Sequence, residues 1–207
     1  ELAKLWSLRA LNFESNSLTG SIPSELADLP QLQSLILDWN DLTENIPSRL
    51  GSNGRLLELV LSDNKLTGNV PASLPLSKNL NVVALDDNRL EGNIGFLNAF
   101  VNLTTVFLED NMFTGTINDD FLKSHISLKW LDLSSNLLDG SLPSHLLQMG
   151  IEILDLHGNS LEGDLPSSLT NDNTALTFLS LYQNGFGGEI PESLTKLKSL
   201  SHLDLAE

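Results

Sequence analysis

The sequence has no cysteine among its 207 residues. Disulfide bridges, thiol catalysis and thiolate metal sites are therefore excluded, although this absence does not identify the compartment, because a secreted protein can lack bridges. Aromatic residues make up only 6% of the chain, against a hydrophobic content of 41%. Aliphatic side chains must therefore fill most of a sizeable core.

Positive charge is also scarce. The chain has 11 lysine and arginine residues against 27 acidic residues, which gives a net charge of −16. This balance argues against nucleic acid and anionic membranes as partners, because both require a positive surface. No apolar run approaches the length of a membrane span, and no signal segment opens the chain. The charge favours a basic or apolar partner.

The sequence consists of eight copies of one pattern and a truncated ninth. Each copy reads L-x-x-L-x-L-x-x-N-x-L, as in "LQSLILDWNDL" from Leu32, and successive copies start 23 to 25 residues apart. In a short strand, alternate side chains point to opposite faces, so Leu35 and Leu37 point inward while Ser34 and Ile36 face outward. Stacked copies would build one continuous aliphatic core that no single copy could bury alone.

One asparagine of each copy lies where the chain turns out of the predicted strand. Its amide can pair with backbone groups of neighbouring copies, and an unsatisfied buried amide would cost about 1–3 kcal/mol. We therefore interpret this column as structural. It consists of Asn16, Asn40, Asn64, Asn88, Asn111, Asn136, Asn159 and Asn184.

After the asparagine, most copies continue as L-x-G-x-[IVL]-P, followed by a tail such as "SELADLPQL" with leucines at helical spacing. This pattern resembles the plant-type leucine-rich repeats of receptor-like kinases, receptor-like proteins and polygalacturonase-inhibiting proteins. The resemblance implies an α/β-type repeat solenoid, a horseshoe or superhelix with a parallel sheet on its concave face. It implies an extracellular or cell-surface location, and it concerns function only by analogy.

The chain departs from that family in several places. It lacks the usual cysteine-stapled caps, opens with "ELAKLWSL" and stops inside the ninth strand. We therefore expect residues 1–207 to be a single uncapped solenoid, with eight full repeats and partial repeats at both ends, from a longer protein. Glu44 replaces the glycine of the pattern, and Gly95 and Asn118 replace the proline. Local deviations are expected in those copies.

The outward residues of the predicted strands are free to specialise. An apolar band and an acidic edge stand out, and together they predict a surface for a basic or partly apolar protein or peptide. The predicted ligand-binding residues are Ile36, Asp38, Trp39, Val60, Asp63, Val82, Asp86, Asp87, Phe107, Glu109, Asp110, Trp130, Ile153, His157, Phe178 and Tyr182. Ala84 continues the apolar band.

The sequence gives little support for a catalytic or metal-binding site. Asp132 and Asp155 share one column, and Asp155, His157 and Ser134 suggest a triad, but strand-face residues offer no oxyanion hole. The stretch "ALDDNRLEG" fails as a calcium loop, because Glu91 stands at its sixth position instead of glycine. We predict no enzymatic activity, metal or cofactor.

One acceptor triplet for N-glycosylation begins at Asn102. Serine, threonine and asparagine are so plentiful in this chain that a single triplet indicates nothing about a secretory history.

Three functions remain open at this point. The leading hypothesis is an extracellular recognition module that binds a protein or peptide on its concave face. The alternatives are a secreted hydrolase inhibitor of the polygalacturonase-inhibitor type and a structural or assembly subunit. An ice-binding role would need a flat array of like side chains, and the strand-face columns are too heterogeneous for it.

Overall fold

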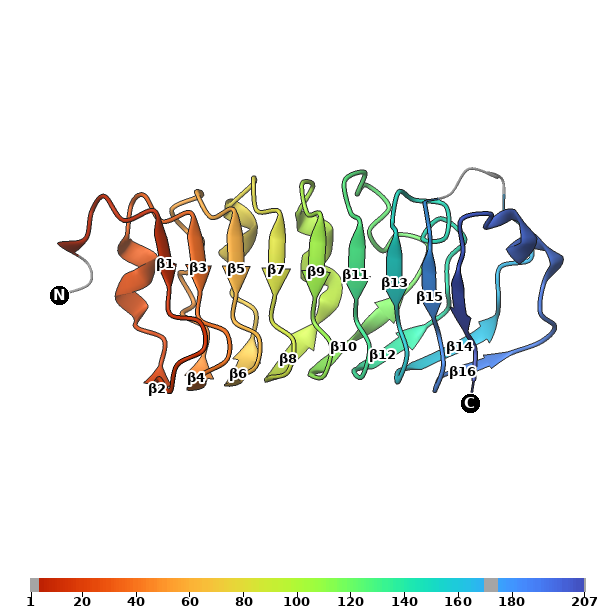
Figure 1. Ribbon diagram of the computed structural model, residues 1–207, viewed down its shortest axis with the longest axis horizontal. Helices are drawn as coiled ribbons and strands as arrows, with labels where there is room; N and C mark the ends of the chain where they lie inside the picture. Colours follow the sequence, from red (N-terminus) through yellow and green to blue (C-terminus); the bar gives the residue numbers. More distant parts are fainter. Residues whose placement is uncertain (1–3, 170–174, 207) are drawn as a thin grey trace.

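The computed structural model describes residues 4–169 and 175–206, which form a stack of similar coils along one axis (Figure 1). One parallel sheet of nine short strands runs along the stack, and a second parallel sheet of eight strands follows the turn after each asparagine. The first sheet consists of β1 (Ala10–Asn12), β3 (Ser34–Ile36), β5 (Glu58–Val60), β7 (Val82–Ala84), β9 (Thr105–Phe107), β11 (Trp130–Asp132), β13 (Ile153–Asp155), β15 (Phe178–Ser180) and β17 (His202–Asp204).

The second sheet occupies the L-x-G-x-[IVL]-P segments, which the sequence had not predicted to be strands. Its strands are β2 (Thr19–Ser21), β4 (Asp41–Asn45), β6 (Lys65–Asn69), β8 (Arg89–Asn93), β10 (Met112–Ile117), β12 (Leu137–Gly140), β14 (Ser160–Asp164) and β16 (Gly185–Gly187). Each coil therefore contributes one strand to each sheet, so the parallel-sheet solenoid is confirmed.

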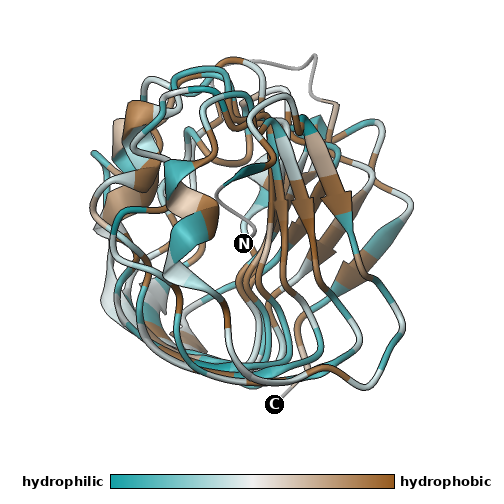
Figure 2. Ribbon diagram, turned by 90° about the vertical axis from the view of Figure 1, so that its left-hand side faces the viewer, coloured by the Kyte–Doolittle hydropathy of each residue, from teal (hydrophilic) through white to brown (hydrophobic). Residues whose placement is uncertain are grey.

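The outer side of the solenoid carries 3-10 helices. Every helix in the described part of the chain is of this short type: η2 (Ser24–Asp28), η3 (Leu74–Leu76), η4 (Ile94–Ala99) and η5 (Glu192–Lys196). Figure 2 shows these helices across the coil from the strands of the first sheet. The leucines at helical spacing thus form tight turns, because a repeat of about 24 residues that already contains two strands leaves room for little more.

A single leucine-rich core runs through all coils. Leu35 and Leu37 of the β3 coil are buried, as are the equivalent inward residues of every following coil up to Leu179 and Leu181. In the first coil, Leu11 is only partly buried and Phe13 is exposed. The outer side contributes further leucines such as Leu26. Because every coil buries its leucines against its two neighbours, packing repeats along the axis.

The asparagine column fastens the coils to one another, as the sequence predicted. The Asn64 amide donates to the Leu37 carbonyl of the preceding coil at 3.1 Å, and to the Leu61 and Ser62 carbonyls of its own. The Asn64 carbonyl accepts from the Leu42 N–H of the preceding coil at 2.9 Å. From Asn40 to Asn184, each such asparagine therefore pairs with backbone groups at the ends of first-sheet strands and at the start of a second-sheet strand.

The departures from the repeat pattern are accommodated without loss of the second sheet. Glu44 has a positive φ of 64° in place of glycine, and it follows a coil in which the short Ser21 stands where the next three coils have an asparagine. Gly95 donates its N–H to Asn93 Oδ1 at 2.7 Å, which proline could not do. Both coils keep their register with their neighbours.

Candidate functional site

The outward side chains of the first sheet form a face, which we call the first-sheet face. Its first row runs from Ala10 through Ser34 and Glu58 to Val82, Thr105, Trp130, Ile153, Phe178 and His202. Its second row runs from Asn12 through Ile36 and Val60 to Ala84, Phe107, Asp132, Asp155, Ser180 and Asp204. Register pairing confirms that each row is continuous across the strands.

Two further rows follow the carboxyl ends of these strands. The third row contains Glu14, Asp38, Ser62, Asp86, Glu109, Ser134, His157 and Tyr182. The fourth row contains Ser15, Trp39, Asp63, Asp87, Asp110, Ser135, Gly158 and Gln183. Backbone hydrogen bonds such as Trp39 N–H to the Ser62 carbonyl, at 3.1 Å, hold these rows in register.

The predicted apolar band lies on this face. Ile36, Val60 and Phe107 are half-buried in the second row, whereas Ala84 is only 6% exposed and adds little accessible surface. Trp130 is 43% exposed in the first row. Its ring centroid lies 6.1 Å from that of Phe107, with the two planes tilted by 36°. This aromatic pair is the centre of the band.

Towards the last coils, the band continues as stacked rings. His157 lies parallel to Tyr182, with centroids 4.2 Å apart. Phe178 lies parallel to His202, with centroids 4.5 Å apart. Three of these residues were predicted, whereas His202 was not selected, although its place beside Phe178 in the first row could have identified it. Val82 and Ile153, also predicted, are half-buried in the same row.

The third row holds carboxylates in an unfavourable environment. Burial raises the pKa of Asp38 and of Asp86, and the neighbouring acids Glu14 and Asp63 add to the effect at Asp38. Burial raises the pKa of Glu109 from 4.5 to about 8, with further contributions from Asp132 and Asp86. The Asp86 carboxylate accepts from the Ser62 hydroxyl. These groups lack the solvation that an ordinary surface carboxylate has.

The backbone conformation of the fourth row explains which residue types occur in it. Every residue in it has a positive φ, from 49° at Asp63 and Asp87 to 62° at Gly158. Aspartate, asparagine and glycine tolerate this region best, so Asp63, Asp87 and Asp110 suit their positions as scaffold residues. Trp39, with a φ of 54° and 60% exposure, does not follow this preference and is the bulkiest member of the row.

Three carboxylates from two coils converge at this edge. Asp63, Asp86 and Asp87 each place an oxygen within 4.8 Å of the other two. The segment that contains Asp86 and Asp87 does not match a calcium loop, because Glu91 stands at its sixth position, and the fold adds Asp63 from the preceding coil. Mutual repulsion contributes to the raised pKa values of Asp86 and Asp87, after burial. We assign no metal to this group.

The aspartates of the second row serve the backbone. Asp132 Oδ1 accepts from the Ser134 N–H at 3.0 Å, and Asp155 Oδ1 accepts from the His157 N–H at 3.1 Å. The His157 Nδ1 also lies 2.8 Å from Asp155 Oδ1. The Ser134 hydroxyl donates to Asp132 at 2.6 Å, which leaves it outside a triad with His157. These carboxylates therefore satisfy backbone N–H groups just after the ends of β11 and β13.

Asn102 lies at the opposite edge of the first sheet, ahead of β9. Its side chain is exposed, and its Nδ2 donates to the Lys78 carbonyl at 2.8 Å. The amide that would carry a glycan therefore already bridges two coils. Glycosylation at this position stays a prediction.

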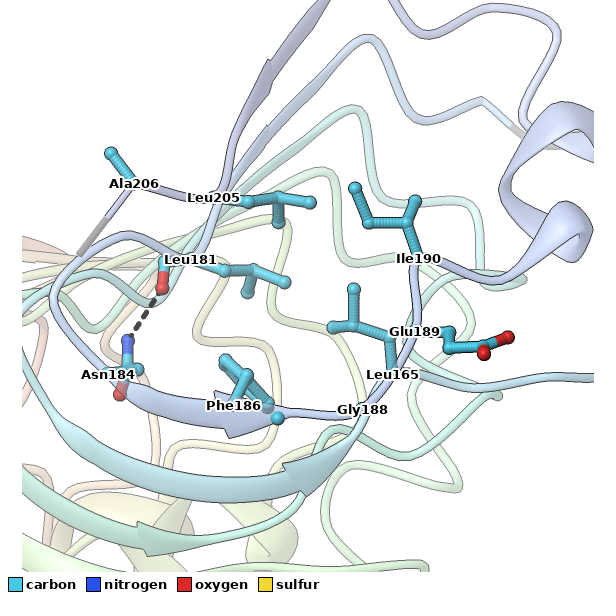
Figure 3. A pocket seen from close by; sticks show the side chains of 10 residues that line it. Leu165, Leu181, Asn184, Phe186, Gly188, Glu189, Ile190, Leu205 and Ala206 are labelled. Atoms are coloured by element: carbon cyan, nitrogen blue, oxygen red, sulfur yellow. Dashed lines mark hydrogen bonds between the residues drawn. The ribbon is translucent and has the colours of Figure 1, made fainter.

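A pocket of about 180 Å³ lies away from the first-sheet face, beside β16 and β17 (Figure 3). Leu165, Leu181, Phe186, Ile190 and Leu205 line it. Leu165 and Leu181 belong to the leucine core, and Phe186 and Leu205 pack against it. It is the end of that core at the last coil. In the described part of the chain, no helix is long and apolar enough to cross a membrane.

The sequence profile described as Leucine Rich Repeat matches residues 7–29, 55–76, 127–149, 150–171 and 175–197, which is more than half of the chain. No curated protein sequence matches this chain. Among solved structures, the chain resembles the leucine-rich-repeat ectodomain of the plant membrane receptor kinase GASSHO1/SCHENGEN3 from Arabidopsis thaliana, in complex with CASPARIAN STRIP INTEGRITY FACTOR 2. The TM-score is 0.89 at 37% identity, covering 98% of this chain and 24% of that one.

Two other structures show the same coil. The plant peptide hormone receptor RGFR1, in complex with RGF2, matches with a TM-score of 0.90 at 26% identity, covering all of this chain and 33% of that one. A plant ice-binding protein matches with a TM-score of 0.84 at 29% identity, covering 99% of this chain and 66% of that one. The chain thus spans between a quarter and a third of the two receptor ectodomains. The chain belongs to the leucine-rich-repeat family, in its plant-type subclass.

Proposed function

We propose that the first-sheet face binds an extended segment of a protein or peptide, as the extracellular ligand-binding region of a receptor-like protein. The observation that carries this proposal is the aromatic pair of half-buried Phe107 and exposed Trp130 at the centre of an apolar band. Aromatic side chains are favoured as anchors in protein interfaces. The fold is known as a binding module, and several similar structures are plant receptor ectodomains in complex with a peptide.

The composition of the face supports recognition over packing. The inward residues of the first sheet are leucine or valine in every coil from Leu35 to Leu181, because they must fit the same core. The band, by contrast, changes from Val60 to Phe107 and Trp130 within three coils, although no packing requirement on the solvent side selects such side chains. A contiguous apolar surface of this kind marks interaction sites in soluble proteins.

To test the proposal, the protein is immobilised, and binding peptides are selected from a display library of random linear sequences. The affinity of the best peptide is then measured for Phe107→Ala and Trp130→Ala. Each variant should weaken binding by about 1 kcal/mol or more, since buried aromatic anchors contribute at least this much. Trp6→Ala is the matched control, because Trp6 is 69% exposed and precedes the first strand.

Unchanged affinity for both face variants would refute this assignment of the binding surface. The hydrolase-inhibitor and scaffold hypotheses make a different prediction. A folded protein would then bind the face in a way that Phe107→Ala weakens, while the peptide library would yield no binder that depends on it.

A further inference from the structure

Negative charge is concentrated on the first-sheet face. The third and fourth rows between β3 and β9 carry six carboxylates, and none of the four rows contains a lysine or arginine. The acids are Asp38, Asp63, Asp86, Asp87, Glu109 and Asp110. Lys65 stands beside the fourth row, but its Nζ lies 2.6 Å from Asp41 Oδ1, on the second sheet. The charge of this part of the face is open to a partner.

Two of these acids, Asp38 and Glu109, have a buried carboxylate oxygen without a hydrogen-bond partner. Glu109 is the one whose pKa burial raises to about 8. Its Oε2 is buried and has no hydrogen-bond partner, whereas Asp86, its neighbour in the third row, has the Ser62 hydroxyl. The charged groups that act on Glu109 are Asp132, Asp86 and Asp87, and all three are acidic. A half-buried carboxylate whose charged neighbours are all acidic is costly to ionise, and an added cation would reduce that cost.

Glu109 also lies next to the aromatic pair. Phe107 precedes it by two residues on the same strand face, and Trp130 packs on Phe107 from the next coil. An arginine side chain can place its guanidinium on a carboxylate while its planar group or stem covers an aromatic ring. Lysine can do the same with its longer aliphatic stem. The face therefore offers apolar and anionic contacts within the reach of one basic side chain.

Resting on the proposed function, we propose that the bound segment carries a basic residue whose cation is held by Glu109, between Asp86 and Asp132, while its stem packs on Phe107 and Trp130. Glu109 is then the residue that selects a basic ligand, and the aromatic pair is the anchor that any ligand uses. The partner is an extended peptide segment with arginine or lysine beside an apolar residue. Asp86 and Asp132 on either side strengthen the negative potential.

This assignment has a consequence for pH. Burial holds the pKa of Glu109 near 8, so at neutral pH the carboxyl is largely protonated, and binding of a cation must release that proton. The affinity for a basic peptide should therefore rise with pH up to about 8, by at most about tenfold per pH unit. A peptide with glutamine in place of the basic residue should not show this rise.

The test uses the peptides selected on the wild-type chain. The expected result is a basic residue at one fixed position of the enriched sequences, and a loss of about tenfold or more when it is replaced by glutamine in the synthetic peptide. Glu109→Gln should cause a similar loss with the basic peptide and no loss with the glutamine peptide. Glu91→Gln is the matched control, because Glu91 is exposed on β8 of the second sheet.

Other outcomes would separate the proposed role of Glu109 from the proposed peptide-binding face. Peptides that depend on Phe107 or Trp130 but lack a shared basic residue, or that bind Glu109→Gln and the wild type equally, would overturn the role of Glu109 and leave the peptide-binding face intact. If no selected peptide depends on Phe107 or Trp130, both proposals fall. Circular dichroism spectra of Glu109→Gln and of a second variant, Asp132→Asn, are compared with that of the wild type. Unchanged spectra show that a loss of binding is not a loss of fold.

Discussion

The two sheets of the solenoid come from the same repeat, yet their residues are constrained in different ways. In the second sheet, a positive-φ residue recurs in each coil from Gly20 to Gly188, and only Glu44 departs from glycine among these positions. On the first-sheet face, the side chain at one position changes from Val60 to Phe107 to Asp155. The backbone fixes the second sheet, whereas the first-sheet face is free to vary. Recognition is therefore expected on the face that packing does not specify.

The largest expected effect concerns the asparagines that join the two sheets. The Asn136 amide donates to the Leu108 carbonyl at 2.9 Å, and its Oδ1 accepts from the Phe113 N–H at 2.9 Å. Asn136→Ala would leave these buried groups without partners, so the free energy of unfolding should fall by about 2–3 kcal/mol. Denaturant titration measures this loss.

Asn16 provides the control for that prediction. It is exposed, and its amide donates only to the Phe13 and Glu14 carbonyls of its own coil. Asn16→Ala should therefore cost about 1 kcal/mol or less. If the two alanine variants lost equal stability, the column would not work by linking coils.

A smaller effect is expected within the second sheet. Gly92 has a φ of 100°, and a Cβ at this position would overlap the Asn69 side chain of the preceding coil. Gly20 has a φ of 83°, with no atom within 4 Å of where its Cβ would lie. Gly92→Ala should destabilise the protein by about 1–3 kcal/mol, and Gly20→Ala by about 1 kcal/mol, because only the former adds a clash to backbone strain. Thermal melts of both variants make the comparison.

On the first-sheet face, the expected effect depends on pH. Because the pKa of Glu109 is raised from 4.5 to about 8, the folded chain keeps a proton that the unfolded chain has released. Its contribution to stability therefore decreases as the pH rises from about 4.5 to 8 and is constant above that range. Glu109→Gln should remove this decrease. A stability profile with the same slope for wild type and variant would show that the carboxyl titrates normally.

The smallest effect is expected on the outer side, away from both sheets. His125 is only 3% exposed, and burial lowers its pKa below 6.5, although the Leu97 and Leu122 carbonyls partly oppose this. The unfolded chain then binds a proton more readily, so stability is lost as the pH falls below about 6.5. His125→Gln should reduce this acid sensitivity. Denaturant titrations at pH values on either side of 6.5 would measure it, with His202→Gln on the exposed face as control.

Much of the fold follows from particular residues of the sequence. The alternation around Leu35 and Leu37 predicts which side chains are buried, and the spacing of about 24 residues predicts which residues share a row. The partners of the asparagine column followed from the hydrogen-bonding capacity of a buried amide. The second sheet did not follow, since its segments contain glycine and proline, which are depleted in strands. Only stacking of successive coils supplies the hydrogen bonds that make them strands.

The site was predicted in part. The rows that contain Phe107, Trp130 and Glu109 were identified, because residues one repeat apart must lie side by side in a parallel sheet. The sequence could not show that Ala84 is buried or that His202 stacks on Phe178, because both depend on the shapes of neighbouring side chains. Binding by any of these residues stays a prediction.

The sequence by itself determined the repeat, the leucine core and the order of side chains along each row, because a fixed period in the chain becomes a fixed neighbourhood in a stacked solenoid. Tertiary structure alone decided how those neighbours affect one another. "ALDDNRLEG" contains no calcium loop, yet its Asp86 and Asp87 meet Asp63 from the preceding coil. Glu109 is an ordinary acid in the sequence, and only its burial among other carboxylates raises its pKa to about 8. Charge and solvation depend on distances in space, which the order of residues does not give.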